Sequence, residues 1–269
     1  MGFAVPLAIR KPFKPLRTLL RVAGLFLIGF LLNLTSHKFD FTTVRIFGVL
    51  QRISICYILL VGIHCLTDYG SKYLRKYGAM FVVLMSALYM GVMISFEDGA
   101  NCSRLNNLSK LCNFTRWLDL KVIHYEHMLK PTDPEGIFST LSSLLTAYGG
   151  YLFCLVMKDN KKKSDIARQW FSWAIFFVLL SFPISLFMPY NKKLWTTSFA
   201  LLTIGICGTM LVLMLGLIDV AGSPGGRFSR WIDILTSPFL WLGMNPLAIF
   251  FLMDLTGVLM IRIIFVGDG

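Results

Sequence analysis

The segment Leu194–Ile218 (LWTTSFALLTIGICGTMLVLMLGLI) decides the fold class, because it is apolar throughout and carries no charged side chain. An α-helix rises about 1.5 Å per residue, so this segment is long enough to cross the ~30 Å hydrocarbon core of a bilayer. Similar apolar segments occur at about 17–34, 46–66, 77–95, 136–156, 169–188 and 237–253. The sequence therefore predicts an all-α, polytopic transmembrane helical bundle of about seven spans.

The composition of the chain excludes other common classes of protein. Of its 269 residues, 56% are hydrophobic and only 15% are charged, which is unusual for a soluble protein, although the net charge is +12. An aromatic content of 14% argues against a disordered tail that binds nucleic acid. We expect one membrane domain over residues 1–269 and no nucleic-acid partner. The apolar stretch that contains Arg262 either extends the last span or lies at the membrane interface.

The positive charge is concentrated in alternate loops. Basic residues gather at about 10–17, 72–76, 158–168 and 227–230, which are the N-terminal segment and every second loop. Loops rich in Lys and Arg remain in the cytosol. This pattern predicts a cytosolic N-terminus and a lumenal position for the longest loop, 96–135.

The long loop carries two further signs of a lumenal environment. Cys102 and Cys112 are two of only six cysteines, and a disulfide between them suits an oxidising compartment. Three N-x-[ST] glycosylation sequons begin at Asn101, Asn107 and Asn113. We therefore predict a glycosylated lumenal loop in an integral protein of the lysosomal membrane or another endomembrane.

Polar residues at the lumenal span ends are the candidate site, because polar groups inside a membrane are costly and usually face the bundle interior. Arg45, Gln51 and Arg52 open the second span, and Gly48 between the arginines allows close approach of another group. The arginines either snorkel and pair with acids, or line a cavity wall that binds an anion. Both interpretations stay open.

Two carboxylates precede the fourth span, at Asp133 and Glu135. A helix cap explains one of them, and both could face the arginines of the second span. The remaining cavity-lining candidates are Asn191, Lys192, Trp195 and Ser198, before and at the start of the sixth span, and Asn245 in the seventh. Trp195 could instead be an interfacial anchor, and Asn245 could bond to carbonyl groups freed by the following proline.

Four short strings in this order resemble the lysosomal heparan-α-glucosaminide N-acetyltransferase family: Val44–Arg52 (VRIFGVLQR), Asp133–Gly136 (DPEG), Asn191–Trp195 (NKKLW) and Gly243–Asn245 (GMN). The resemblance implies a transmembrane acyltransferase that moves acetyl from cytosolic acetyl-CoA to the terminal glucosamine of heparan sulphate in the lumen, without a metal. Arg17 and Arg21, at the cytosolic end of the first span, suit the nucleotide part of acetyl-CoA. The expected partners are thus the bilayer, acetyl-CoA and the heparan sulphate end, with a homodimer as a further option.

The chain departs from the family at its N-terminus, because the lumenal segment that carries the family's proposed catalytic histidine has no counterpart here. No catalytic residue is therefore assigned in this chain. We interpret the sequence as a fragment, an isoform or a short homologue, incomplete at the N-terminus and near the C-terminus, and we expect the polypeptide alone to lack acetyltransferase activity. Clear acetyl-CoA-dependent N-acetylation of glucosamine by this polypeptide would contradict that expectation.

Two other classes of function fit the same spans. A multi-pass transporter would also carry polar residues in its spans, although paired broken helices are typical of that class. A non-catalytic membrane scaffold or pseudoenzyme would need no active site. Uptake of a solute without acetyl-CoA would favour the transporter.

Overall fold

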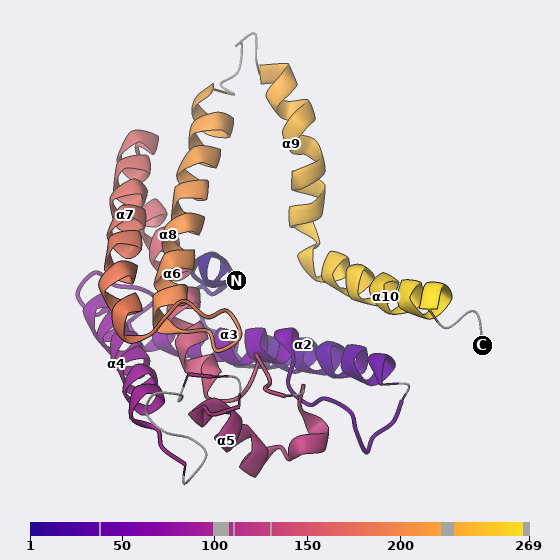
Figure 1. Ribbon diagram of the computed structural model, residues 1–269. Coiled ribbons are helices and arrows are strands. Elements are labelled where there is room, and N and C mark those ends of the chain that lie inside the picture. Colours follow the sequence, from indigo (N-terminus) through magenta and orange to yellow (C-terminus); the bar gives the residue numbers. More distant parts are fainter. Residues whose placement is uncertain (38, 99–107, 110, 130, 222–228, 266–269) are drawn as a thin grey trace.

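The computed structural model describes residues 1–37, 39–98, 108–109, 111–129, 131–221 and 229–265. These residues form helices and no strands, which confirms the predicted all-α class (Figure 1). Six helices are long and apolar enough to cross a membrane. They are α2 (Pro15–Ser36), α3 (Val49–Leu66), α4 (Arg75–Ser95), α6 (Ser139–Asp159), α7 (Lys163–Phe187) and α8 (Thr197–Met214), which continues as a π-helix, η4 (Leu215–Ala221).

The seventh predicted span is broken. Helices α9 (Ser229–Met244) and α10 (Pro246–Phe265) meet at Asn245, and the apolar parts on either side of this residue are bent by 88° (Figure 1). Pro246 has no N–H to continue the α9 ladder, but its fixed φ suits the first position of a new helix. Counting the bent pair as one span gives seven. The backbone at Arg262 continues α10.

Helix α6 forms the centre of the bundle. It packs against α3, α4 and α8, and also against the short N-terminal helix η1 (Gly2–Ala4). In its most apolar window 61% of the residues are buried, compared with 22% in α2 and in α7. Since lipid covers the outer faces of such helices, α6 is the element around which the others assemble.

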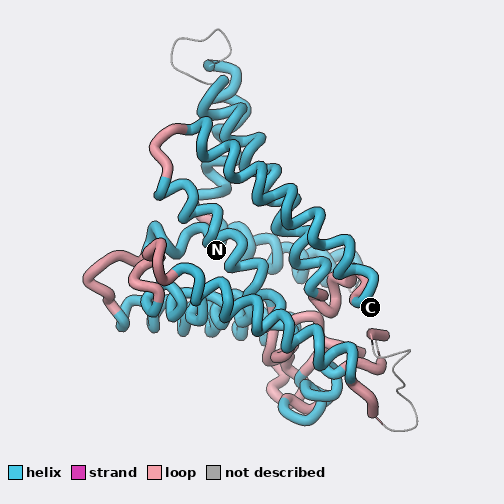
Figure 2. The backbone as a smooth tube through the Cα atoms, turned by 90° about the vertical axis from the view of Figure 1, so that its left-hand side faces the viewer, coloured by secondary structure: helices cyan, strands magenta, loops and turns pink. Residues whose placement is uncertain are grey.

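Shorter elements lie beside the long helices. Helix α1 (Val5–Ala8) continues from η1 and contacts α3 and α6. Helix α5 (Phe114–Val122) and the 3₁₀ turn η3 (Tyr125–His127) lie in the chain between α4 and α6, and helices make up most of the tube in Figure 2. The side chain of Asn113 caps α5 by accepting the N–H of Arg116 at 2.8 Å.

Helices α7 and α8 approach each other closely because small residues line their contact. A Cβ atom on Gly205 of α8 would lie 2.8 Å from the carbonyl oxygen of Ala174 and 3.0 Å from the backbone nitrogen of Val178 on α7. Backbone atoms move less readily than side-chain ends, so this position needs glycine. Small residues at such contacts are typical of membrane helix pairs.

We predict that Gly205→Ala pushes α7 and α8 apart and lowers the free energy of unfolding by about 1–3 kcal/mol, the usual cost of overpacking. Gly91→Ala is the matched control, because nothing lies within 4 Å of a Cβ at Gly91 of α4. Chemical unfolding of both variants in detergent micelles measures the difference. Equal stabilities would show that the α7–α8 contact tolerates a methyl group.

Candidate functional site

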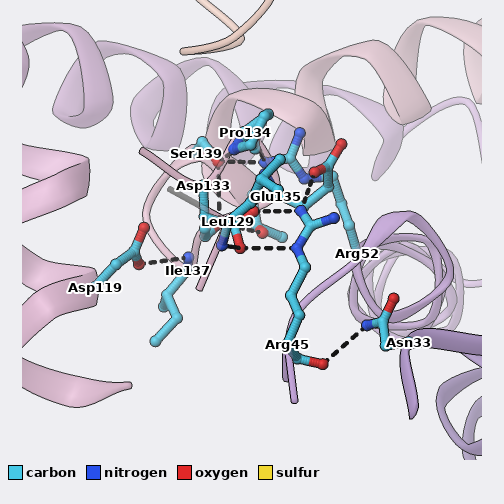
Figure 3. A network of polar contacts seen from close by, with 12 residues as sticks. Asn33, Arg45, Arg52, Asp119, Leu129, Asp133, Pro134, Glu135, Ile137 and Ser139 are labelled. Atoms are coloured by element: carbon cyan, nitrogen blue, oxygen red, sulfur yellow. Dashed lines mark hydrogen bonds and ion pairs between the residues drawn. The ribbon is translucent and has the colours of Figure 1, made fainter. Parts of the chain in front are cut away.

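A buried ion network joins the loop before α3 to the loop before α6 (Figure 3). Arg45 donates from Nε to Oδ2 of Asp133 at 2.9 Å, and its Nη2 contacts both Asp133 and Glu135. The Asp133 side chain is 1% exposed, whereas those of Arg45 and Glu135 are 16% and 18% exposed. Burial of this kind costs several kcal/mol per ion, so the network requires well-formed contacts on both sides.

Asp133 also organises the loop that precedes α6. Its carboxylate accepts the backbone N–H groups of Leu129 and Glu135, each at 3.0 Å. These bonds, together with the guanidinium of Arg45, occupy both carboxylate oxygens. Charge-assisted bonds of this type are the strong ones, and they offset part of the cost of burying the charge.

Arg52, on α3, is the second arginine of the site, and its contacts differ from those of Arg45. Its Nη2 donates to the carbonyl oxygen of Pro134 and to Oγ of Ser139, and its guanidinium lies 5.4 Å from the ring centroid of Trp195. Its Nε and Nη1 are buried and have no hydrogen-bond partner within the described part of the chain. Arg52 therefore has donors to spare, and no carboxylate forms an ion pair with it among the described residues.

Gln51 precedes Arg52 on α3 and is fully buried. Neither its amide nitrogen nor its amide oxygen has a hydrogen-bond partner among the described residues. A Cβ on Gly48 would lie 3.0 Å from the Gln51 oxygen and 3.1 Å from Nδ2 of Asn33. The close approach that the sequence predicts at Gly48 is thus made by two amide side chains.

The structure brings together Arg45, Arg52, Asp133 and Glu135, with Trp195 stacked beside Arg52. Of the two interpretations open for the arginines, pairing with acids describes Arg45. Both carboxylates, Asp133 and Glu135, face the arginines, as the sequence suggested. Trp195 also donates from its indole nitrogen to Thr146 of α6 at 3.2 Å, so its polar edge points into the bundle.

The other candidates near this end of the bundle shape a turn before α8. The Asn191 side-chain oxygen accepts backbone N–H groups within the turn, at 2.9 Å and 3.4 Å, and Ser198 donates to the carbonyl oxygen of Met188 at 2.6 Å. Lys192 is exposed. These bonds fix the position from which Trp195 reaches Arg52.

Three predicted residues lie away from the network. Asn245 is exposed at the break between α9 and α10. Arg17 and Arg21 lie at the opposite end of α2 from Asn33, about 24 Å away for Arg17 at 1.5 Å per residue. There they line a pocket with other basic residues.

The predicted glycosylation sites and disulfide of the loop 96–135 lie partly outside the described residues. Asn101, Asn107 and Cys102 lie there, while Cys112 takes part in a disulfide. Asn113 is 1% exposed, and its Nδ2, the atom that would carry a glycan, donates to the carbonyl oxygen of Ser109 at 2.8 Å. No group of three or more potential metal ligands occurs in the described part of the chain.

Several residues that contact the ion network were not among the site residues predicted from the sequence. Asn33 donates from Nδ2 to the carbonyl oxygen of Arg45 at 3.0 Å, and Ser139 accepts from Arg52 (Figure 3). His127 contacts the carbonyl oxygen of Val44 through Nδ1 at 2.9 Å. Asn33, at the end of an apolar span, carried a usable signal, whereas a serine near a helix start is too common to stand out.

Asp119 on α5 is the other residue that the sequence does not single out. It is fully buried, its Oδ1 accepts the backbone N–H of Ile137 at 3.0 Å, and its Oδ2 has no partner among the described residues. Burial raises the pKa of its carboxyl group to about 7, and the nearby charge of Asp133 raises it further, against the opposing effects of the Ile137 N–H and Arg52. This carboxyl group therefore titrates near neutral pH.

We predict that Asp119 makes the fold less stable as the pH rises. Its pKa is higher in the folded chain than the ordinary value of 3.8, so its stabilising effect is complete below about pH 4 and is lost as the pH passes about 7. Asp119→Asn keeps the oxygen that accepts the Ile137 N–H but cannot ionise. It should flatten the fall in melting temperature between pH 5 and pH 8 and exceed the unchanged chain in stability at pH 8.

Thermal unfolding followed by tryptophan fluorescence across this pH range tests the Asp119 prediction. Asp98→Asn, at an exposed position, is the control and should leave the pH profile unchanged. Parallel profiles for Asp119→Asn and the unchanged chain would contradict the titration of Asp119.

Comparison with known proteins gives two related sequences. The chain is 22% identical to human heparan-alpha-glucosaminide N-acetyltransferase over 251 aligned residues, which cover 77% of this chain and 36% of that protein. It is 25% identical to the mouse protein of the same name over 127 residues, 44% of this chain and 18% of that protein. The chain thus spans about a third of the length of the human relative, and no family model matches it.

Proposed function

We propose that this chain forms the membrane core of an acetyltransferase that moves acetyl from acetyl-CoA to the terminal glucosamine of heparan sulphate. The similarity to the human and mouse enzymes supports the reaction class. The single observation that carries the proposal is the pair Gln51 and Arg52, whose buried amide and guanidinium groups have donors without a partner among the described residues. The chain spans about a third of the length of the human relative, so the activity of the whole enzyme is itself part of this proposal.

These donors suit the chemistry of acetyl transfer. The amine attacks the thioester carbonyl carbon, and a C–N bond forms as the C–S bond breaks. The proton that the amine gives up passes to the leaving thiolate, which becomes the free thiol of coenzyme A. Negative charge collects on the carbonyl oxygen in the transition state. Donors that are already fixed in a site without water stabilise that charge strongly. In this proposal Nε and Nη1 of Arg52 receive the oxygen, and the Gln51 amide, which lies toward Gly29 of α2, binds another polar group of the acetyl donor.

Arg45 takes a different part in the proposal. Its guanidinium is neutralised by Asp133 and Glu135, so little of its charge is left for a ligand. It anchors the loop whose Pro134 carbonyl holds one end of Arg52. Arg45 is therefore a positioning residue in this scheme, and Arg52 is the residue that contacts the acyl group.

We also infer a cytosolic N-terminus and a lumenal loop 96–135, in a lysosomal or other endomembrane. Three contacts gather basic loop residues at one end of the bundle. Lys11 pairs with Asp68 at 2.5 Å, Arg75 pairs with Asp159 at 2.8 Å, and Lys158 donates to the carbonyl oxygen of Pro6 at 3.3 Å. A single basic end is what the positive-inside rule associates with the cytosol.

Replacement of Gln51 by leucine separates a ligand-binding role from a structural one. If Gln51 only fills space, Gln51→Leu removes two unpaired polar atoms of a buried side chain and should stabilise the fold slightly. If Gln51 binds a polar group of the acetyl donor, the variant should remain folded and bind acetyl-CoA at least tenfold more weakly. We predict the second result, measured as the shift in melting temperature with acetyl-CoA concentration.

The control for this test lies one turn along the same helix. The hydroxyl of Ser54 donates to the backbone carbonyl oxygen of Gln51 at 2.7 Å, so its hydrogen bond is made within the helix. Ser54→Ala should therefore bind acetyl-CoA as before. Binding is measured instead of turnover because the chain spans only about a third of its relative. Unchanged acetyl-CoA binding by Gln51→Leu would remove Gln51 from the proposed site.

A further inference from the structure

A basic pocket lies at the start of α2, far from the ion network. Its volume is about 270 Å³, and no acidic residue lines it within the described part of the chain. Lys11 is paired with Asp68 across the rim, whereas Arg10 is bonded only to a backbone carbonyl among the contacts described. The basic residues that line the pocket are Arg10, Lys11, Lys14, Arg17 and Arg21.

The start of α2 adds to the positive potential of this pocket. The helix begins at Pro15 and runs to Ser36, and the unpaired N–H groups of its first turn carry the positive end of the helix dipole. Lysine and arginine side chains together with a helix N-terminus bind phosphate groups well. The pocket therefore suits an anionic headgroup that carries phosphate.

An apolar groove leaves this pocket on one side of α2. It has a volume of about 500 Å³ and runs between α2 and α3, where Leu16 and Leu19 face Ile58 and Val61. Phe13 and Thr18 line both the groove and the basic pocket, so the two are continuous.

A second apolar groove leaves the pocket on the other side of α2. Its volume is about 420 Å³, and it is lined by Leu25 and Ile28 of α2, by Tyr57 of α3 and by the N-terminal segment. Arg21 lines both this groove and the basic pocket. The Tyr57 hydroxyl is buried and has no partner in the described part of the chain, so a polar group is available beside an otherwise apolar wall.

We propose that this pocket and its two grooves form a binding site for an anionic diacyl phospholipid. The phosphate-bearing headgroup lies against Lys14, Arg17 and Arg21, and one acyl chain enters each groove. The Tyr57 hydroxyl is placed to donate to an ester carbonyl at the top of its chain. One charged pocket with two apolar branches matches a glycerophospholipid, whereas a soluble phosphate compound such as coenzyme A has a single arm.

The lipid site is independent of the proposed acetyl transfer, although Arg17 and Arg21 are the residues that the sequence favours for the acetyl-CoA nucleotide. Both ligands carry phosphate, so removing positive charge weakens either one. The grooves distinguish them, because only a diacyl lipid fills both. The test therefore needs charge variants and groove variants, read out by binding alone.

The charge test uses the detergent-solubilised chain with added phosphatidylserine or phosphatidylcholine, and measures lipid retained by native mass spectrometry. We expect phosphatidylserine to be retained at least tenfold better than phosphatidylcholine. The triple variant Lys14→Ala, Arg17→Ala, Arg21→Ala should lose this preference. The control Lys161→Ala, Lys162→Ala, Lys163→Ala, in the basic segment that follows α6 and ends at the first residue of α7, should keep it. Equal loss in both triple variants would overturn the assignment of the pocket.

The groove test uses glycines at which a larger side chain meets open space. A Cβ on Gly24, Gly62 or Gly91 has nothing within 4 Å, and the first two line the two grooves whereas Gly91 does not. Gly24→Phe and Gly62→Phe should each reduce phosphatidylserine retention at least fivefold, and Gly91→Phe should not. Melting temperatures confirm that each variant is folded.

The same variants are also tested for binding of coenzyme A, which represents a soluble ligand that carries phosphate. If the groove variants retain phosphatidylserine fully while the charge variant loses coenzyme A binding, the pocket holds a soluble phosphate and the lipid proposal is wrong. If phosphatidylserine retention falls in both sets and coenzyme A binding is unchanged in all variants, the lipid site stands. Neither outcome depends on the Gln51 test of the acetyl site.

Discussion

The buried carboxylate of Asp133 connects parts of the chain that are far apart in the sequence. It accepts bonds from Arg45, which precedes α3, and from two backbone N–H groups of the loop that leads into α6. Removing one partner of a buried ion pair costs about 3–5 kcal/mol, because a charge is then left unpaired. In a membrane bundle whose outer helices bury few residues, such a contact fixes how α3 and α6 meet.

The consequences of that contact reach the candidate site directly. The loop held by Asp133 presents the carbonyl oxygen of Pro134 to Arg52, and Ser139 at the start of α6 adds a second acceptor. Trp195, positioned by the turn before α8, covers the same guanidinium. Arg52 is thereby held from three sides, and two of its nitrogen atoms have no hydrogen-bond partner among the described residues.

The two ends of the bundle differ in chemistry. At one end, charges gather in a buried network, in which the two arginines Arg45 and Arg52 balance the two carboxylates Asp133 and Glu135. At the other end, the pocket at the start of α2 collects basic side chains without lining acids among the described residues, and apolar grooves lead away from it. The first arrangement suits a small polar reaction centre, and the second suits the surface of an acidic membrane leaflet.

The sequence by itself determined the helical class, the approximate spans and the alternation of basic loops, because each depends on the local run of apolar or charged residues. It also identified Arg45, Arg52, Asp133, Glu135 and Trp195, since polar groups near span ends are rare enough to notice. Only the tertiary structure decided that Arg45 is neutralised while Arg52 keeps donors without a partner among the described residues, that Asn191 and Ser198 shape a turn, and that Asp119 is buried. Those properties depend on which side chains meet across helices, and a linear pattern of residues does not contain that information.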